Sequence, residues 1–297
     1  MTAGRTEQVV WTRGRGCSEL AELLGGGESA RIKGDLAEEC IEHRADLLVS
    51  RKMPGSFDLV NIAVPVDFDP SKVTKVVATV GGGPHSLLAA TTARRLASSL
   101  DVEAEMVSAA GPEDSDFDAR GVLEQIGDEL PEVNRRVVEV EGVGDIVEQL
   151  EPGALLVIGA PGGSWLQRSM MGPGARLRRT AQAGAVIVRS APDRVYRFMG
   201  DPVYVAPLRT ADDTLRFHRE DTLAVADQGR LVGLVKRAQL LEAGAAPVGS
   251  VMEEAVSVRQ DDTLDEAHAL EPTFGSDPIP VTDDEEHLVG GLLLPVA

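Results

Sequence analysis

The residues best suited to chemistry lie in a glycine- and arginine-rich stretch, IGAPGGSWLQRSMMGPGARLRR, at residues 158–179. Glycines let the backbone approach a ligand and turn its amides inward, and those of interest are Gly159, Gly162, Gly172 and Gly174. Arg168 and three later arginines add positive charge, while no Asp or Glu occurs between Pro152 and Pro192. A helix beginning near Pro173 would add its positive end. The stretch predicts a site for an anion, above all a nucleotide phosphate; alternatively, its arginines pair with an acidic partner surface.

A second glycine run, GGGPHS, lies at residues 81–86 and directly follows the apolar run KVVATV. Gly81, Gly82 and Gly83 would let a ligand approach the backbone closely. His85 and Ser86 come next, and we expect them to be a surface histidine at a helix start and a capping serine, with ligand contact as the alternative. We therefore add the three glycines to the predicted nucleotide site.

No pattern typical of a catalytic centre accompanies these glycines. The histidines are scattered without metal-ligand spacing: His43, His85, His218, His268 and His287. No Gly-x-Ser-x-Gly sequence is present, and DDEEH at residues 283–287 is expected to be a solvated turn. We expect neither a catalytic residue nor a metal site, and no enzymatic activity beyond weak ATP hydrolysis. GGGPHS is distantly similar to the SGGxDS loop of adenylylating enzymes, but it lacks that loop's first Ser and its Asp.

The elements that would position these loops lie between residues 74 and 190. Short β-branched runs predict strands, and amphipathic stretches between them predict helices. The expected strands are 75–80, 103–108, 135–140, 154–159 and 185–189, and the expected helices are 84–100, 117–130 and 144–150. This alternation predicts a parallel sheet covered on both faces. Ligands of such sheets bind beyond the carboxyl ends of the strands, where the loop after Gly159 lies.

The first 70 residues echo part of this unit. GDLAEECIEHRADLLVS at residues 34–50 is similar to GDIVEQLEPGALLVIG at residues 144–159, although chance could produce such a match. The similarity predicts that residues 1–70 are a shortened second copy of the central fold. This copy lacks the glycine loop, so we expect a packing partner that binds no ligand.

A different repeat follows Pro192. VYVAPLRTADDTL (203–215) parallels AVSVRQDDTL (255–264), and DQGRLVGLV (227–235) parallels DEEHLVGGL (284–292). Each unit predicts a strand, a turn, an Asp-Asp-Thr-Leu helix start, an acidic hairpin turn and a glycine-containing strand. The Asp or Thr side chain is expected to cap the helix by accepting its free amides.

The glycine spacing resembles the nucleotide loop of the universal stress protein family, Gly-x-x-Gly, nine residues, then Gly-Ser or Gly-Thr. The similarity covers residues 74–190 and, more loosely, the first 70, as a tandem with a degenerate first copy. It implies an adenine-nucleotide α-hydrolase-like (Rossmann-like) fold, ATP or AMP as ligand with Mg²⁺ possible beside ATP, and phosphate contacts at Gly159, Gly162 and Gly172. Two positions depart from the family: Pro173 replaces the Ser or Thr, and Gly81 replaces an Asp near the ribose.

The C-terminal repeat resembles a pair of CBS domains, which bind adenosine ligands between two copies. VGSVMEEAVSVRQDDTLDEAHAL is the clearest match, and the resemblance covers about residues 196–297 as a smaller α+β module. Lys236 and Gln239 stand where binding members have Thr or Ser and Asp. The resemblance therefore implies a structural or dimerising pair, with nucleotide sensing as the alternative.

Composition limits the setting and the partners. The formal net charge of -19 argues against nonspecific nucleic-acid binding, which needs a basic face. Only five of the 29 basic residues are lysines, a composition that indicates a salt-accumulating, haloarchaeal-like source or a GC-rich genome. Cys17 and Cys40 show no metal spacing, and neither a signal peptide nor a long apolar run is present. We expect a cytoplasmic protein that does not insert into a membrane.

Together these features predict three parts: a degenerate half domain at 1–70, a universal-stress-like domain at 74–191 and a shortened CBS pair at 195–297. The expected function is regulation in a stress response, in which a bound adenine nucleotide changes how the protein engages a partner. We expect a homodimer, and by analogy with related tandem domains a membrane transporter is a possible partner. The alternatives are a scaffold that binds no nucleotide and an adenylylating enzyme.

Overall fold

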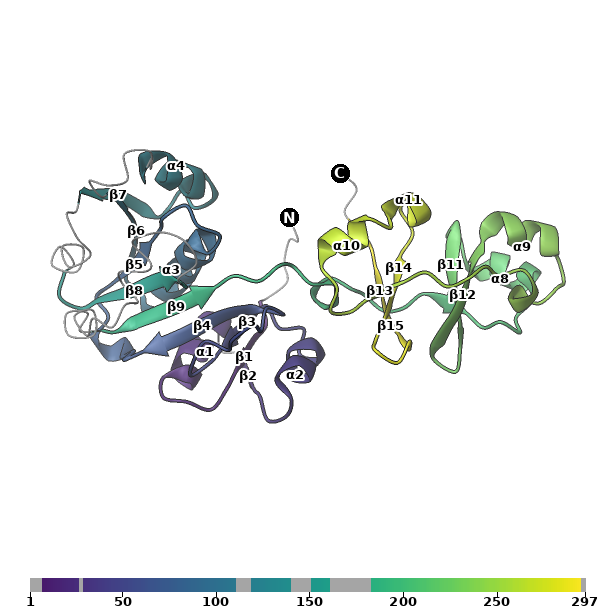
Figure 1. Ribbon diagram of the computed structural model, residues 1–297, viewed down its shortest axis with the longest axis horizontal. Helices are drawn as coiled ribbons and strands as arrows, with labels where there is room; N and C mark the ends of the chain where they lie inside the picture. The colour runs from purple at the N-terminus through teal and green to yellow at the C-terminus, as the bar shows by residue number, and fades with distance from the viewer. Residues whose placement is uncertain (1–6, 27–28, 111–118, 140–150, 161–182, 295–297) are drawn as a thin grey trace. The chain divides into compact units, whose positions relative to one another are not determined.

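A computed structural model describes residues 7–26, 29–110, 119–139, 151–160 and 183–294. The chain divides into two compact units, Met1–Ala191 and Pro192–Ala297. Each unit has its own sheets, which Figure 1 shows.

The first unit is built on one nine-stranded sheet. Across the sheet the strands are β2 (Ser29–Arg31), β1 (Val9–Trp11), β3 (Leu47–Val49), β4 (Asn61–Val66), β9 (Ala185–Arg189), β8 (Ala154–Gly159), β5 (Lys75–Thr79), β6 (Glu103–Ala110) and β7 (Asn134–Glu139). Neighbouring strands are parallel except β4 and β9, whose arrows point in opposite directions in Figure 1. The predicted parallel α/β sheet is thus confirmed, with one antiparallel join at its centre.

Four described helices accompany this sheet: α1 (Cys17–Gly25), α2 (Leu36–Glu42), α3 (Ser86–Leu100) and α4 (Ala119–Glu129). One face of the sheet packs against α1, α3 and α4, with Val76 and Ala78 of β5 in the same core as Ala89 and Ala93 of α3. Val77 points to the opposite face, because successive strand residues alternate, and it is also buried. Both faces are therefore covered, which explains why these strands are almost continuously apolar.

The first unit contains two copies of one connection pattern. The first copy consists of β1, α1, β2, β3 and β4. In the second copy the same relative places are taken, in the same order, by β5, α3, β6, β8 and β9, and this copy also has α4 and β7. The last strands of the two copies, β4 and β9, pair from Ile62↔Arg189 to Val66↔Ala185. The two copies therefore meet about a pseudo-twofold at the antiparallel join.

The second unit also contains two copies. The first comprises β10 (Tyr204–Val205), α8 (Ala211–Phe217), β11 (Thr222–Asp227), β12 (Arg230–Lys236) and α9 (Arg237–Ala243). The second comprises β13 (Val258–Arg259), α10 (Leu264–His268), α11 (Glu271–Phe274), β14 (Ile279–Thr282) and β15 (Leu288–Leu292). Each copy forms a three-stranded sheet with one parallel and one antiparallel pair. This unit is the smaller α+β module that the repeat predicted.

The two copies exchange the segments that precede them. The segment before the first copy pairs with the second, where the Gly200 amide donates to the Gly291 carbonyl at 2.8 Å. The segment before the second copy pairs with the first, where the Glu253 amide donates to the Leu234 carbonyl at 2.7 Å. Each sheet is thus extended by chain from the other copy, which binds the pair into one body.

The predicted alignment of the two Asp-Asp-Thr-Leu sequences is wrong by about one helical turn. In the second copy, Thr263 is the N-cap of α10, and its hydroxyl accepts from the Glu266 amide at 3.2 Å. In the first copy, the equivalent N-cap is Thr210, whereas Thr214 lies inside α8 and donates its hydroxyl proton to the Thr210 carbonyl. Both threonines can start a helix, so the letters alone do not fix the register.

Candidate functional site

The predicted glycine site lies at a topological switch point of the sheet. From β5 the chain goes to β6 and β7 on one side, and it returns to β8 on the other. β5 and β8 are parallel neighbours with Thr79 opposite Ile158, so the loop after β5 lies beside Gly159. The structure therefore brings Gly81, Gly82 and Gly83 together with Gly159, at the edge where such sheets bind ligands. The other predicted contacts lie outside the described residues: Gly162, Arg168, Gly172 and Gly174.

The glycine loop after β5 is held from inside by the start of α3. Gly82 has a φ of 69°, a backbone conformation that favours glycine. The Ser86 hydroxyl accepts from the Gly81 amide at 3.2 Å, and the Ser86 amide donates to the Gly83 carbonyl at 3.0 Å. Ser86 thus fixes the loop instead of capping the helix as we expected. Within the described part of the chain, the Gly82 and Gly83 amides have no acceptor.

His85 ties this loop to the end of β9. Its Nδ1 accepts from the Ser190 amide at 3.1 Å, and the Ser190 hydroxyl lies 2.7 Å from the same nitrogen. Burial, and then the positive charge of Arg189, lower the pKa of His85 from its ordinary value of 6.5. The neutral ring therefore carries its proton on Nε2, because Nδ1 is an acceptor.

In the second unit, Lys236 and Gln239, the two positions compared with the CBS nucleotide site, form bonds within the protein. The Lys236 ammonium lies 3.0 Å from the Glu253 carboxylate, and the Gln239 side-chain amide donates to that carboxylate at 2.9 Å. Gln239 also accepts from the Lys236 amide at 2.7 Å. Because Glu253 belongs to the exchanged segment, this cluster fastens that segment to the first copy.

Two cavities in the first unit were not predicted. One, of about 570 Å³, is lined by Arg13, Gly14, Arg15 and Arg51. These residues follow β1 and β3, so this cavity also lies at carboxyl ends of parallel strands. The sequence signal was an apolar run followed by a basic, glycine-punctuated turn, VVWTRGRG, but the remote Arg51 joins it only through strand pairing.

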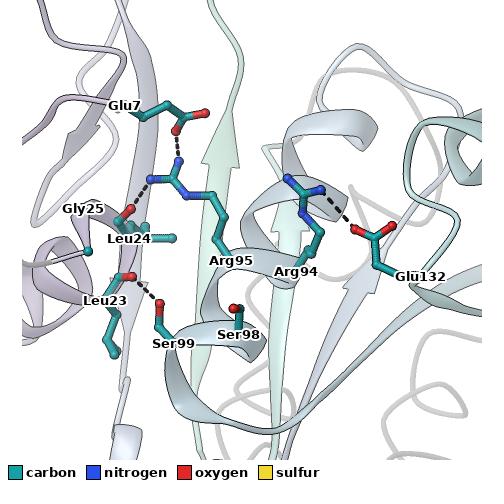
Figure 2. A pocket seen from close by; sticks show the side chains of 10 residues that line it. Glu7, Leu23, Leu24, Gly25, Arg94, Arg95, Ser98, Ser99 and Glu132 are labelled. Atoms are coloured by element: carbon teal, nitrogen blue, oxygen red, sulfur yellow. Dashed lines mark hydrogen bonds and ion pairs between the residues drawn. The ribbon is translucent and has the colours of Figure 1, made fainter. Parts of the chain in front are cut away.

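The other cavity, of about 560 Å³, lies where the C-terminal end of α1 meets α3. Figure 2 shows that several of its polar groups are paired: Ser99 donates to the Leu23 carbonyl at 2.7 Å, and Arg95 bonds to the Leu24 carbonyl and to Glu7. Arg94 pairs with Glu132 at 3.0 Å. These contacts satisfy carbonyls at the end of α1, so this cavity has a structural explanation.

No group of three His, Cys, Asp or Glu side chains among the described residues has the arrangement needed to hold a metal ion. None of the helices described is both long and apolar enough to cross a membrane.

The comparisons with known proteins concern about a third of the chain. No family model matches the sequence, and no curated protein matches it. Similar solved structures include the cytosolic domain of the Mg²⁺ channel MgtE in complex with ATP, at 27% identity over 34% of this chain and 46% of that one, with a TM-score of 0.31. The chain thus covers less than half of that domain. A second is a CBS domain pair/ACT domain protein from Thermotoga maritima, at 23% identity over 34% of this chain and 89% of that one, with a TM-score of 0.32. A third is CBSX2 in complex with AMP, at 24% identity over 34% of this chain and 90% of that one, with a TM-score of 0.30.

Proposed function

We propose that this chain is a cytoplasmic regulatory protein that binds an adenine nucleotide at the glycine edge of its first unit. Nucleotide binding there changes how the protein engages a partner. The first unit acts as a tandem of universal-stress-type copies, of which the second holds the nucleotide, and the CBS-like unit acts as a structural or dimerising module.

The observation that supports this proposal is the convergence of two glycine segments on one switch point. Gly81–Gly83 and Gly159 come from parallel neighbouring strands, and the Gly82 and Gly83 amides have no acceptor in the described residues. The adjacent α3 is 15 residues long, so its N-terminal end adds a favourable potential for a phosphate. Neither VGGGPHS nor Gly159–Ala160 contains a carboxylate, so these two segments offer no side-chain ligand to a Mg²⁺ ion.

The CBS-like unit suggests which ligands and partners to test first. ATP and AMP are named in two of the similar structures, and MgtE is a Mg²⁺ channel. These likenesses serve only to choose the ligands and partners to be tested. A membrane transporter is therefore the first partner class to test.

The proposal is tested by calorimetric titration of the full chain with ATP, ADP and AMP, with and without Mg²⁺. Gly82→Val should abolish most of the binding, because a β-branched residue is strained at a φ of 69° and would distort the glycine loop. Gly26→Val is the matched control, since Gly26 has a φ of 61° and open space around it, far along the chain from the loop.

The two variants make the outcome decisive. Saturable nucleotide binding that Gly82→Val weakens at least tenfold and Gly26→Val leaves unchanged would support the sensor. Folded wild-type protein that takes up no nucleotide would overturn it and leave the scaffold function. Equal binding by both variants would place the nucleotide elsewhere and reject this site.

A further inference from the structure

The first copy of the sheet has a switch point of its own. From β1 the chain goes to β2 on one side, and it then returns to β3 on the other side of β1. The residues that follow β1 and β3 at this point include Arg13, Arg15 and Arg51. They occupy the places that the glycine segments occupy in the second copy, and together with Gly14 they line the 570 Å³ cavity.

Backbone contacts fix the two loops that carry these arginines. The Thr12 amide donates to the Val49 carbonyl at 2.9 Å, and the Arg51 amide lies 3.3 Å from the Thr12 hydroxyl, to which it donates. A Cβ added at Gly14 would lie 2.9 Å from both Arg51 Cβ and Cys17 Sγ. The Arg51 stem therefore crosses directly over Gly14, which lies between Arg13 and Arg15 in the chain.

These three arginines differ from most others in the first unit, which have acidic or carbonyl partners. Arg94 pairs with Glu132, Arg136 with Glu105, and Arg189 donates to carbonyls of the loop before β4. Arg13, Arg15 and Arg51 are exposed and have no acceptor for their guanidinium groups among the residues described. These three positive charges around one cavity, in a chain of net charge -19, create a local positive potential that favours binding of an anion.

We propose that this arginine pocket, Arg13, Arg15 and Arg51 around Gly14, binds the phosphate groups of a soluble polyphosphate, either a nucleotide or an inorganic chain. Guanidinium groups bind phosphate oxygens in a bidentate way, and three of them match a ligand with several negative charges. The cavity volume lies in the range of small-molecule sites. The pocket is separate from the proposed glycine site, because the antiparallel join sends the carboxyl ends of the two copies to opposite edges of the sheet.

The test compares the wild-type chain with the triple variant R13Q/R15Q/R51Q and with Arg120→Gln. Arg120 is exposed on α4 and lies outside the pocket, so its substitution controls for a lost surface charge. Inorganic tripolyphosphate, ATP and adenosine are titrated calorimetrically at low salt and in 0.5 M KCl. Hydrogen bonds to charged groups predict a loss of about tenfold in tripolyphosphate affinity per arginine removed, and salt should weaken the wild-type binding.

The readouts separate this site from the glycine site. Tripolyphosphate binding that the triple variant loses, and that both Arg120→Gln and Gly82→Val retain, would support the arginine pocket whether or not the glycine site binds. Tighter binding of ATP than of tripolyphosphate in Gly82→Val would identify a nucleotide as the ligand, and equal binding an inorganic polyphosphate. The same affinity in the triple variant and Arg120→Gln, or no binding to folded wild-type protein, would overturn the proposal.

Discussion

At the scale of single residues, His85 links the glycine loop to the end of β9 through one acceptor nitrogen. The bond from the Ser190 amide requires that Nδ1 be unprotonated, and the neighbouring Arg189 disfavours a second positive charge. The neutral ring is therefore part of the folded structure at the glycine edge.

Because the pKa of His85 is lower in the folded protein than its ordinary value of 6.5, the unfolded chain binds the proton more readily. The contribution of His85 to the free energy of unfolding is complete above pH 6.5, and it is lost as the pH falls through that value toward the folded pKa. Urea unfolding between pH 5.5 and 7.5 should show this loss in the wild type, and a smaller one in His85→Gln. Identical profiles for the wild type and His85→Gln would contradict the prediction.

At the scale of elements, the glycines of β12 and β15 are explained by the exchanged segments. A Cβ at Gly233 would lie 2.7 Å from the Glu253 carbonyl and 2.9 Å from Met252 Sδ, and one at Gly290 would lie 2.8 Å from Met199 Sδ. Each third strand therefore needs a glycine where a methionine of the incoming segment crosses it. The sequence repeat predicted strands that contain glycine at these places, but it did not indicate which segment crosses them.

Gly233→Ala should destabilise the second unit by about 1–3 kcal/mol, the usual effect of overpacking a close contact. Gly200→Ala is the matched control, since the nearest atom to its added Cβ would be 3.9 Å away. Hydrogen exchange of peptides covering β12 and residues 248–259, together with urea unfolding, measures both variants. Equal stability of the two variants would show that the exchanged segment can shift to make room.

The elements predicted from the sequence were those with apolar runs, β-branched runs or amphipathic patterns. The strands at 75–80, 154–159 and 185–189 appear within one residue, because runs of Val, Ile and Leu strongly favour buried strands. The short β1 and β2, with three residues each, gave no comparable signal. The arginine pocket was missed for another reason: Arg51 meets Arg13 and Arg15 only through the pairing of β1 with β3, which sequence spacing does not contain.

At the scale of the whole molecule, net charge is the dominant feature. A formal charge of -19 on 297 residues means that like charges repel across the folded surface. Screening by salt therefore acts on the charge of the whole surface as well as on individual ion pairs.

The melting temperature should therefore rise with KCl between 0.05 and 1 M, because the screening length shortens to about 3 Å over that range. Differential scanning calorimetry at pH 7 measures the effect. Near the isoelectric point of about 4.7 the repulsion vanishes, so the same salt series should change the melting temperature much less. A melting temperature at pH 7 that does not change, or that falls with salt, would contradict self-repulsion as the cause.

The antiparallel join of β4 and β9 has a consequence for how the two halves can diverge. A symmetric dimer of two identical chains, joined through such a strand pair, would dissociate on dilution. Every substitution in it would also appear at the ligand-binding edges of both copies. Here the halves share one covalent chain, so their encounter is intramolecular at any protein concentration. One half can then keep glycines and the other arginines at equivalent places, so that one sheet carries two chemically different edges.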